Sequence, residues 1–267
     1  MFGPARVTRY TVTSRRGNPL PKTRLVALSD LHACMPWMGK GRIAGLVEQT
    51  NTLGADIVLL LGDYVGHVFG WRDLRPTEVA ELLAGFSAPL GAHAVFGNHD
   101  WSDDMEARRT RKGPTKWHRA FAEAGITVLS NDMLRIDTPQ GVLALAGLES
   151  QRAFHSRTSG ELSGADDLPA LLSQLDPDMP TVLMAHEPDI FPDLPDWIDL
   201  TLSGHTHGGQ VAPFGYPILV PSIHGRRFAY GHHVDGTKQL VVSGGLGMSG
   251  LPIRIGRPAE LVLVDLA

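Results

Sequence analysis

Three short apolar segments near the start of the sequence each run directly into polar residues of types that bind metals. Residues 24–29, 55–61 and 93–96 have the length and apolar character of buried β-strands. Residues 42–53 and 77–86, which lie between them, have apolar side chains near helical spacing. Strands that alternate with helices are typical of an α/β sheet, in which sites form beyond the carboxyl ends of the strands. The three polar ends are therefore predicted to meet in one site.

The residues that follow the strands offer carboxylate, imidazole and amide groups. Asp30 and His32 follow the first strand, Asp63 follows the second and Asn98 follows the third. A later apolar strand segment runs into His186. A mixture of oxygen and nitrogen donors suits divalent first-row ions better than calcium or a structural zinc. These residues are therefore predicted metal ligands.

Two further histidines lie in a glycine-rich stretch, Gly204-His205-Thr206-His207-Gly208-Gly209. In an extended or sharply turned backbone, side chains two residues apart can be directed at one target, whereas on a helix they would diverge by roughly 200°. Taken alone, the pair is equally compatible with a polar turn. The carboxylates and imidazoles elsewhere in the chain favour His205 and His207 as metal ligands.

The remainder of the sequence predicts more strands than helices. Strands are expected at residues 7–14, 125–128, 133–136, 142–148, 181–185, 198–202, 239–243 and 260–266, and helices at 116–124 and 168–175. Thr77 is expected to cap the helix at 77–86. Residues 151–167 are predicted to form a polar loop, and no helix is expected after about residue 196. The predicted fold is a single α/β domain over residues 1–267, a four-layer α-β-β-α sandwich with two facing mixed sheets flanked by helices.

Composition and charge limit the classes of partner. The chain has 267 residues and a net charge of −4, which argues against a nucleic-acid-binding protein that depends on bulk electrostatic attraction. Cys34 is the only cysteine, so no intrachain disulfide is expected. The N-terminal segment has no run of signal-peptide or transmembrane type, and the expected location is cytoplasmic. Basic residues from Arg6 to Arg24 favour either a solvated face or peripheral contact with the inner face of the membrane.

The order of these motifs resembles a known family. Asp-x-His at Asp30, Gly-Asp at Gly62, Gly-Asn-His-Asp at Gly97, the single His186 and Gly-His-x-His at Gly204 occur in the order of the calcineurin-like metallophosphoesterases. The five blocks together are specific, although each alone is weak. The form Gly-His-Thr-His-Gly-Gly-Gln and the later Gly-Leu-Gly-Met-Ser resemble a branch of small bacterial phosphodiesterases of the YkuE and YaeI type. That branch is similar to the enzymes that cleave the pyrophosphate of UDP-2,3-diacylglucosamine.

The resemblance implies a role for each predicted ligand. The first metal would be held by Asp30, His32 and His207, the second by Asn98, His186 and His205, and Asp63 would bridge both. The ligand types admit two divalent ions of Mn, Fe, Zn, Co or Ni, with Mn favoured. Such a pair would activate a bridging hydroxide for in-line attack on phosphorus, with no covalent enzyme intermediate.

His99 and Asp100 are the predicted catalytic residues. His99 follows Asn98 directly, and the resemblance implies that it faces the substrate and stabilises or protonates the leaving oxygen. Asp100 would orient the imidazole, as carboxylates commonly do. The alternative is that the two residues form a structural turn.

The predicted function is a dinuclear metal-dependent phosphoesterase acting on phosphodiester or pyrophosphate-linked substrates, including lipid-bearing ones. The alternatives are a phosphomonoesterase, a nucleotide or nucleic-acid phosphodiesterase with the same site, or a non-catalytic scaffold that binds a protein. The expected partner is a small phosphorylated or phospholipid-like substrate, with no nucleic acid. Apolar stretches at residues 35–38 and 213–221 follow metal motifs and are predicted either to contact an acyl chain or aromatic leaving group or to pack within the fold. The sequence does not fix the oligomeric state.

Several further motifs are secondary candidates for contact with a nucleotide or a phosphate group. Gly245-x-Gly247-x-x-Gly250 matches a dinucleotide-binding pattern, but no helix is expected after it, so a turn near the metal site is predicted. His224 with its neighbouring arginines and His155 with Arg157 are candidates for contact with a phosphate group.

Overall fold

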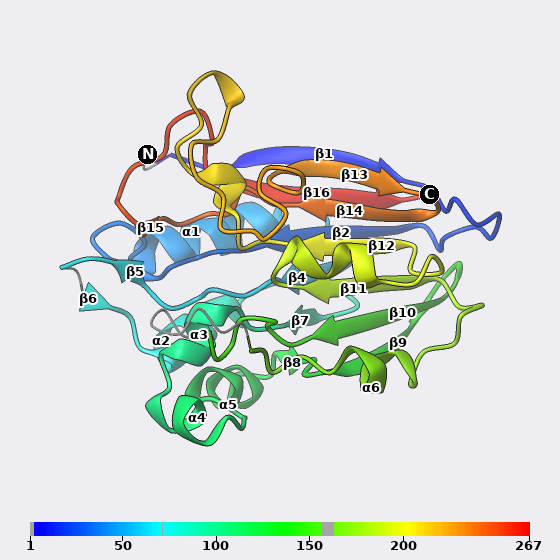
Figure 1. The fold of residues 1–267 in the computed structure, drawn as a ribbon, viewed down its shortest axis with the longest axis horizontal. Coiled ribbons are helices and arrows are strands. Elements are labelled where there is room, and N and C mark those ends of the chain that lie inside the picture. Colours follow the sequence, from blue (N-terminus) through cyan, green and yellow to red (C-terminus); the bar gives the residue numbers. More distant parts are fainter. Residues whose placement is uncertain (1–2, 71, 156–162) are drawn as a thin grey trace.

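Two six-stranded mixed sheets face each other at the centre of the computed structural model (Figure 1). The structure describes residues 3–70, 72–155 and 163–267. The first sheet has the order β1-β16-β2-β4-β7-β8. Its strands are β1 (Arg6–Val12), β16 (Glu260–Leu266), β2 (Thr23–Leu28), β4 (Ile57–Leu60), β7 (Ala92–Ala94) and β8 (Thr127–Val128). From β2 to β8 the strands run parallel, and β16 is antiparallel to β2.

The second sheet has the order β13-β14-β12-β11-β10-β9. Its strands are β13 (Gly231–Asp235), β14 (Lys238–Val242), β12 (Leu200–Ser203), β11 (Thr181–Ala185), β10 (Gly141–Leu148) and β9 (Asp132–Thr138). The four central strands are parallel, and β9 and β13 are antiparallel hairpin partners at the two edges. Two small two-stranded sheets join loops, one of β3 (Cys34–Met35) with β6 (Arg72–Asp73) and one of β5 (His67–Val68) with β15 (Ser249–Gly250).

Helices cover the outer faces of both sheets. The first sheet is covered by α1 (Lys40–Asn51), α2 (Pro76–Leu83) and α5 (Lys116–Glu123), and the second by α6 (Leu168–Leu172) and the 3-10 helix η1 (Pro188–Asp193). The short helices α3 (Asn98–Ser102) and α4 (Met105–Thr110) follow β7. Single 3-10 turns η2 (His207–Gly209) and η3 (Pro213–Gly215) follow β12. Within the described ranges, no helix combines the length and the apolar character needed to cross a membrane.

Alternating side chains explain why these strands are almost wholly apolar. In β2, Leu25 and Ala27 point into the core between the two sheets, whereas Val26 and Leu28 pack in the layer under the helices. A third apolar cluster, which includes Phe191, lies on the outer face of the second sheet. Because both faces of the central strands are buried, they have no polar face. The predicted four-layer α/β sandwich is confirmed.

Some element boundaries differ from the sequence-based expectations. The α2 helix begins at Pro76 rather than at a capping Thr77, because proline is favoured in the first helical turn, where its missing N–H costs nothing. The backbone N–H of Arg75, at the cap position, donates to Glu78 Oε2 at 3.0 Å. The helices α3 and α4 were not predicted, since each is short. After residue 196, the only helical segments of the described residues are the single 3-10 turns η2 and η3, which agrees with the expectation of no helix there.

Candidate metal centre

The sheet topology brings the predicted ligands to one edge of the sandwich. The strands β2, β4 and β7 are parallel neighbours in the first sheet, and β11 and β12 are parallel neighbours in the second. Their carboxyl ends therefore meet at the same edge. Every predicted ligand lies in a turn that follows one of these five strands.

One group of donors consists of Asp30, His32 and His207, all buried. Their ligand atoms lie within 4.8 Å of one another. The Nε2 atoms of His32 and His207 are 3.1 Å apart, and His207 Nε2 is 3.5 Å from Asp30 Oδ1. We call this set the first group.

The second group consists of Asp63, His186 and His205, which are also buried and within 4.8 Å of one another. His186 Nε2 lies 3.2 Å from Asp63 Oδ2. The same carboxylate oxygen is 3.8 Å from His32 Nε2 in the first group. Asp63 therefore lies between the two groups, where a bridging ligand has to be.

Unpartnered polar atoms indicate that the residues fit metal ions. Asn98 Oδ1, His186 Nε2 and both ring nitrogens of His205 are buried and make no hydrogen bond. A buried polar atom without a partner costs about 1–3 kcal/mol. An imidazole, a carboxylate and an amide oxygen directed at one point are suitable ligands for a divalent first-row ion. The donor set thus fits the two ions that the sequence predicts.

The backbone is strained at most of these ligands. Nine non-glycine residues in the described ranges have φ in the left-handed region, and five of them are Asp30, His32, Asp63, His205 and His207, with φ between 45° and 66°. This conformation costs an L-residue roughly 1–2 kcal/mol. Strain of this kind persists only where the surrounding structure enforces it, and it concentrates at functional sites.

Two glycines allow the ligand turns to approach closely. A Cβ atom at Gly97 would lie 2.2 Å from Asp63 Oδ1, and one at Gly62 would lie 2.5 Å from the backbone nitrogen of Gly97. Gly62 also has a φ of 96°, which favours glycine. Any side chain at either position would separate the turn after β4 from the turn after β7.

Backbone carbonyls orient two of the imidazoles. His32 Nδ1 donates to the carbonyl of Val65 at 2.9 Å, and His186 Nδ1 donates to the carbonyl of Leu61 at 2.7 Å. Each bond places the ring proton on Nδ1 and leaves the Nε2 lone pair directed into the site. Metal-binding histidines commonly have such a partner on the second nitrogen.

Burial and charge set the protonation of the imidazoles. Burial lowers the pKa of His32 to about 4 and the pKa values of His205 and His207 well below the usual range. Burial is also the largest single influence on His186, but the carboxylates of Asp63, Glu187 and Asp30 together outweigh it and hold the pKa of His186 well above its usual value. Because neutral imidazole is the metal-binding form, protons compete with a metal mainly at His186.

Asp100 has a different place from the one predicted. Its two carboxylate oxygens accept hydrogen bonds of 2.8–3.1 Å from the backbone N–H groups of Asp63, Tyr64, Val65 and Gly97. None of these bonds goes to the imidazole of His99. Because α3 starts at Asn98, the Asp100 side chain points back over the helix N-terminus and toward the turn after β4. Asp100 therefore holds the turn that carries Asp63, instead of orienting His99.

His99 faces a large cleft in front of the two groups. Its backbone N–H donates to Asp63 Oδ1 at 2.9 Å, and its side chain lines a cleft with a volume of about 1060 Å³. The ring of His67 lies 3.9 Å from the ring of His99, centroid to centroid. Arg108 and Arg152 also line the cleft and place positive charge in it.

Sequence reasoning missed His67 and both of these arginines. His67 continues the segment that begins at Asp63, so its distance along the chain from that ligand was an available signal. The two-stranded sheet of β5 and β15 places it, and His67 Nδ1 lies 2.8 Å from Ser249 Oγ. No local pattern marks the arginines.

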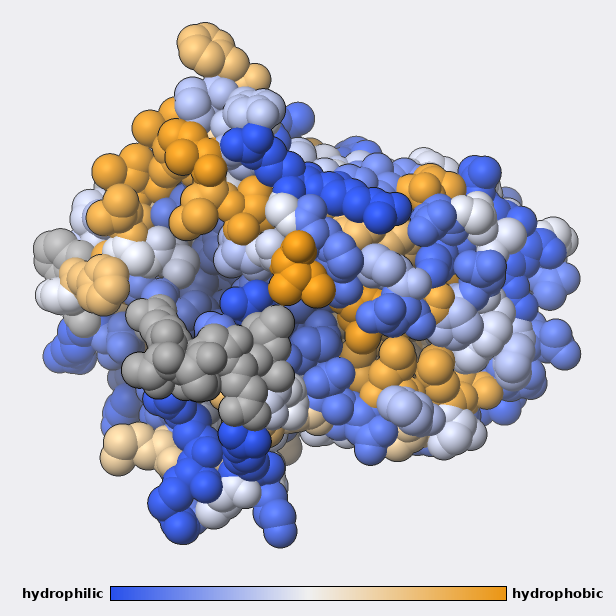
Figure 2. All heavy atoms as spheres, in the orientation of Figure 1, coloured by the Kyte–Doolittle hydropathy of each residue, from blue (hydrophilic) through white to orange (hydrophobic). Residues whose placement is uncertain are grey.

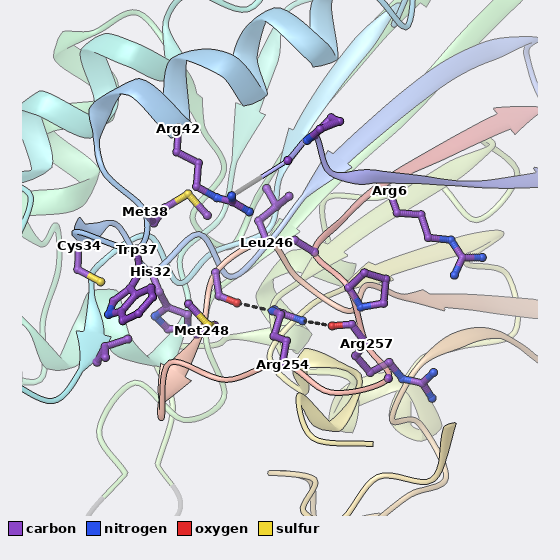
Figure 3. Close-up of a pocket in the computed structure, with 17 residues that line it drawn as sticks. Arg6, His32, Cys34, Trp37, Met38, Arg42, Leu246, Met248, Arg254 and Arg257 are labelled. Atoms are coloured by element: carbon purple, nitrogen blue, oxygen red, sulfur yellow. Dashed lines mark hydrogen bonds between the residues drawn. The ribbon is translucent and has the colours of Figure 1, made fainter. Parts of the chain in front are cut away.

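Arg254 was also missed, and it supports the first group from behind. Its guanidinium donates to the carbonyls of Gly244 and Gly247 at 2.8 and 2.6 Å and lies 3.2 Å from His207 Nδ1. Burial lowers the pKa of Arg254 to about 10, so that it stays charged at neutral pH. Figure 3 shows Arg254 on the wall of a second cavity of about 500 Å³, whose other wall includes His32 and Trp37.

The secondary candidate residues lie in different parts of the structure, and only some of them are near the cleft. His155 lines the cleft, whereas Arg157 lies outside the described residues. His224 Nε2 contacts the carbonyl of Asp189 at 3.2 Å. Cys34 is buried, and this burial is the main cause of the rise in the pKa of its thiol to about 11. The segment that starts at Gly245 forms the predicted turn and packs directly against Asp30.

Comparison with known proteins agrees with this geometry. The family model described as calcineurin-like phosphoesterase matches residues 23–209. A metallophosphoesterase from Caenorhabditis elegans is 31% identical over 251 residues, covering 91% of this chain and 48% of the relative. A zebrafish (Danio rerio) transmembrane protein with a metallophosphoesterase domain is 29% identical, covering 91% of this chain and 53% of the relative. The chain thus spans about half the length of these two relatives.

Two bacterial proteins are also similar. The metallophosphoesterase YkuE of Bacillus subtilis is 26% identical over 246 residues, covering 91% of this chain and 78% of the relative. The crystal structure of the calcineurin-like phosphoesterase YfkN from the same organism superimposes with a TM-score of 0.46 at 12% identity, covering 84% of this chain and 82% of that chain. The predicted resemblance to YkuE-like proteins is confirmed.

Proposed function

Because the chain belongs to the calcineurin-like phosphoesterase family of metal-dependent phosphoric ester hydrolases, we propose that it hydrolyses phosphodiester or pyrophosphate-linked substrates at a pair of divalent ions. The observation that carries the proposal is the pair of buried donor groups with Asp63 between them. Two ions that share one carboxylate are suited to in-line displacement at phosphorus.

We assign the ligands to the two ions as the family resemblance implies. One ion would be held by Asp30, His32 and His207, the other by Asn98, His186 and His205, and Asp63 would contact both. Manganese is favoured over Fe, Zn, Co and Ni. When bound, the ions would polarise the phosphoryl oxygens and lower the pKa of a water molecule.

His99 would act on the leaving oxygen. Burial lowers the pKa of His99 to about 3, which makes the imidazole neutral at physiological pH. A neutral ring stabilises the leaving oxygen by donating a hydrogen bond from its N–H group. Arg108 and Arg152, on the cleft wall, would contact the non-reacting oxygens of the substrate.

The cleft suits a substrate with an apolar group. Ile218, Leu219 and Leu251 line it together with the histidines, and all three are more than half exposed. Such walls fit an acyl chain or an aromatic leaving group better than a free monoester. We therefore propose a small phosphorylated or lipid-bearing substrate and a location at the cytoplasmic face of a membrane. The zebrafish relative and a bovine relative are named as transmembrane proteins, which supports a location at a membrane.

The proposal is tested by a substrate panel with defined metals. Metal-free protein is reloaded separately with Mn²⁺, Fe²⁺, Zn²⁺, Co²⁺ or Ni²⁺ and assayed on a monoester, bis-p-nitrophenyl phosphate, a cyclic nucleotide and a lipid-linked pyrophosphate. We expect turnover of the diester or the pyrophosphate that is lost after chelation and in Asp63→Asn. Equal turnover after chelation and in Asp63→Asn would exclude the proposed centre, and preference for the monoester would exclude the proposed substrate class.

A further inference from the structure

Two loops beside the cleft expose an unusual number of large apolar side chains. The loop from Pro213 to Ile223 and the loop from Leu251 to Ile255 contribute eight residues that we call the apolar rim: Phe214, Tyr216, Ile218, Leu219, Ile223, Leu251, Ile253 and Ile255. Their exposed fractions run from 44% for Ile253 to full exposure for Phe214. Single exposed apolar residues are ordinary, but a contiguous apolar patch marks an interaction surface.

Hydrogen bonds join the two loops into one surface. The backbone N–H of Ala212 donates to the carbonyl of Ile255 at 2.7 Å, and that of Ile218 donates to the carbonyl of Val211 at 3.1 Å. Gln210 Nε2 donates to the carbonyl of Leu251 at 3.0 Å. Figure 1 shows the gold and orange-red loops rising beyond the sheets, and Figure 2 shows hydrophobic atoms gathered on this raised part of the molecule.

Phe214 indicates that the exposure is not incidental. It has a φ of 54°, a conformation that is unfavourable for a bulky side chain and that asparagine or glycine adopts more easily. The phenyl ring contacts solvent entirely at this strained position. The turn therefore presents an aromatic ring outward at a steric cost that no packing within the protein offsets.

Neither rim loop contains a carboxylate, although Asp189 of η1 accepts a hydrogen bond of 3.1 Å from the backbone N–H of Ile223 at the end of the first loop. Between residues 200 and 259 the sequence contains a single carboxylate, Asp235, which lies in the β13–β14 hairpin. The same stretch contains Arg226, Arg227 and Arg257, whereas Arg254 lies behind the first group and is bonded there. The protein as a whole is acidic, with a net charge of −4, so the absence of carboxylates here is local.

Two of these arginines also brace the rim. The guanidinium of Arg226 lies 4.0 Å from the ring centroid of Tyr216 and donates to the carbonyl of Pro217 at 3.0 Å. Arg257 donates to the carbonyl of Gly215 at 3.0 Å. The loop that carries Phe214 is therefore held outward from the protein by cationic side chains.

We propose that the apolar rim docks onto an anionic phospholipid bilayer. Exposed aromatic and aliphatic side chains enter the interface between headgroups and acyl chains, and arginines attract anionic headgroups, each by about 1 kcal/mol. Ile218, Leu219 and Leu251 belong both to the rim and to the cleft wall. The inference rests on the proposed function in one respect: docking would place the phosphoester of a membrane lipid at the mouth of the cleft.

The test is co-sedimentation of the metal-loaded protein with vesicles of phosphatidylcholine, with and without phosphatidylglycerol. We expect wild-type protein to bind the anionic vesicles and Phe214→Asn to bind about tenfold more weakly, because burial of a phenyl ring contributes more than 1.4 kcal/mol. Arg227→Gln, which removes an exposed cation, should bind about fivefold more weakly. Met105→Ser, a matched loss of an apolar residue that is 84% exposed on α4, should bind as wild type does.

Hydrolysis of bis-p-nitrophenyl phosphate distinguishes this inference from the proposed function. Phe214 does not line the cleft, so Phe214→Asn should retain soluble-diester turnover while it loses vesicle binding. Its free energy of unfolding should not fall, since asparagine relieves the strained φ. Wild-type protein that stays in the supernatant, or Phe214→Asn that binds as wild type does, would overturn the inference. So would a wild-type dimer in vesicle-free solution that Phe214→Asn converts to a monomer.

Discussion

The two groups of candidate metal ligands lie side by side, with Asp63 between them, but they are supported in different ways. In the first group a chain of contacts runs from Arg254 through His207 and His32 to the carbonyl of Val65. Because arginine only donates, His207 Nδ1 accepts, His207 Nε2 donates to His32, and His32 Nδ1 donates to Val65. The first group therefore satisfies its own imidazoles.

The second group lacks such a chain. Both ring nitrogens of His205 and the amide oxygen of Asn98 are buried without partners, and only His186 is held by a backbone carbonyl. Two neighbouring candidate metal sites in one cleft can therefore contribute differently to the stability of the fold. An ion in the second group would satisfy polar atoms that nothing else satisfies, whereas an ion in the first group would replace hydrogen bonds that already exist.

The largest expected effect comes from removing one ligand of either group. His207→Ala should release one ion and His186→Ala the other, and each should lower turnover of bis-p-nitrophenyl phosphate by at least about 100-fold, since even outer partners of a metal site contribute 10–100-fold. The metal content of each purified variant, measured by mass spectrometry, should fall from two ions to one. Loss of both ions in either variant would show that the groups are not separate sites.

Asp100→Asn should weaken both groups together. Asparagine replaces one acceptor oxygen with an amide NH₂ group that faces backbone N–H groups of the turn that carries Asp63. Leaving such donors unpaired should lower the free energy of unfolding by about 3 kcal/mol, measured by urea denaturation. An effect on the affinity of one ion only would contradict the placement of Asp100 beneath the shared ligand.

Arg254→Met should affect the first group alone. It removes the donor to His207 and leaves the carbonyls of Gly244 and Gly247 without this partner. The free energy of unfolding of the metal-free protein should therefore fall by about 2 kcal/mol. Arg257→Met is the matched control, because Arg257 also donates to backbone carbonyls but does not contact a ligand. Loss of the second ion in Arg254→Met would contradict the inference that Arg254 supports the first group alone.

The smallest expected effect is a difference in the pH at which the ions leave. The pKa of His186 is raised by Asp63, whereas burial lowers the pKa of His32 to about 4, so protons displace a metal from His186 at the higher pH. As the pH falls, the second group should therefore release its ion first. Metal content after dialysis at stepwise lower pH, compared in His186→Ala and His207→Ala, measures the order of release. Earlier release from the first group would refute this argument.

The sequence was sufficient to predict the layers and to predict that the candidate ligands lie at one edge of the sandwich. Buried strands are recognisable as apolar runs, and the topology of parallel strands requires their carboxyl ends to meet. Asp30, Asp63 and His186 could be identified because each directly follows such a run. The boundaries of short elements, such as α3, could not be identified because five residues carry too little pattern.

The contacts that support the site were not predictable in the same way. The role of Asp100 depends on the direction of a helix start and on a turn with φ of 57° at Asp63, and neither is encoded by residue type. His67 and Arg254 reach the site through pairings between loops far apart in the sequence. Such pairings form only when the two sheets have come together.

The position of the last strand has a consequence for the order of events in synthesis. The strand β16 lies between β1 and β2, so the first sheet is incomplete until residues 260–266 have been made. Arg254 and the turn against Asp30 precede that strand by only a few residues. A nascent chain that ends before this segment already contains all seven proposed ligands, but its first sheet is incomplete. Metal is therefore expected to bind stably only after residues 260–266 have been made and paired.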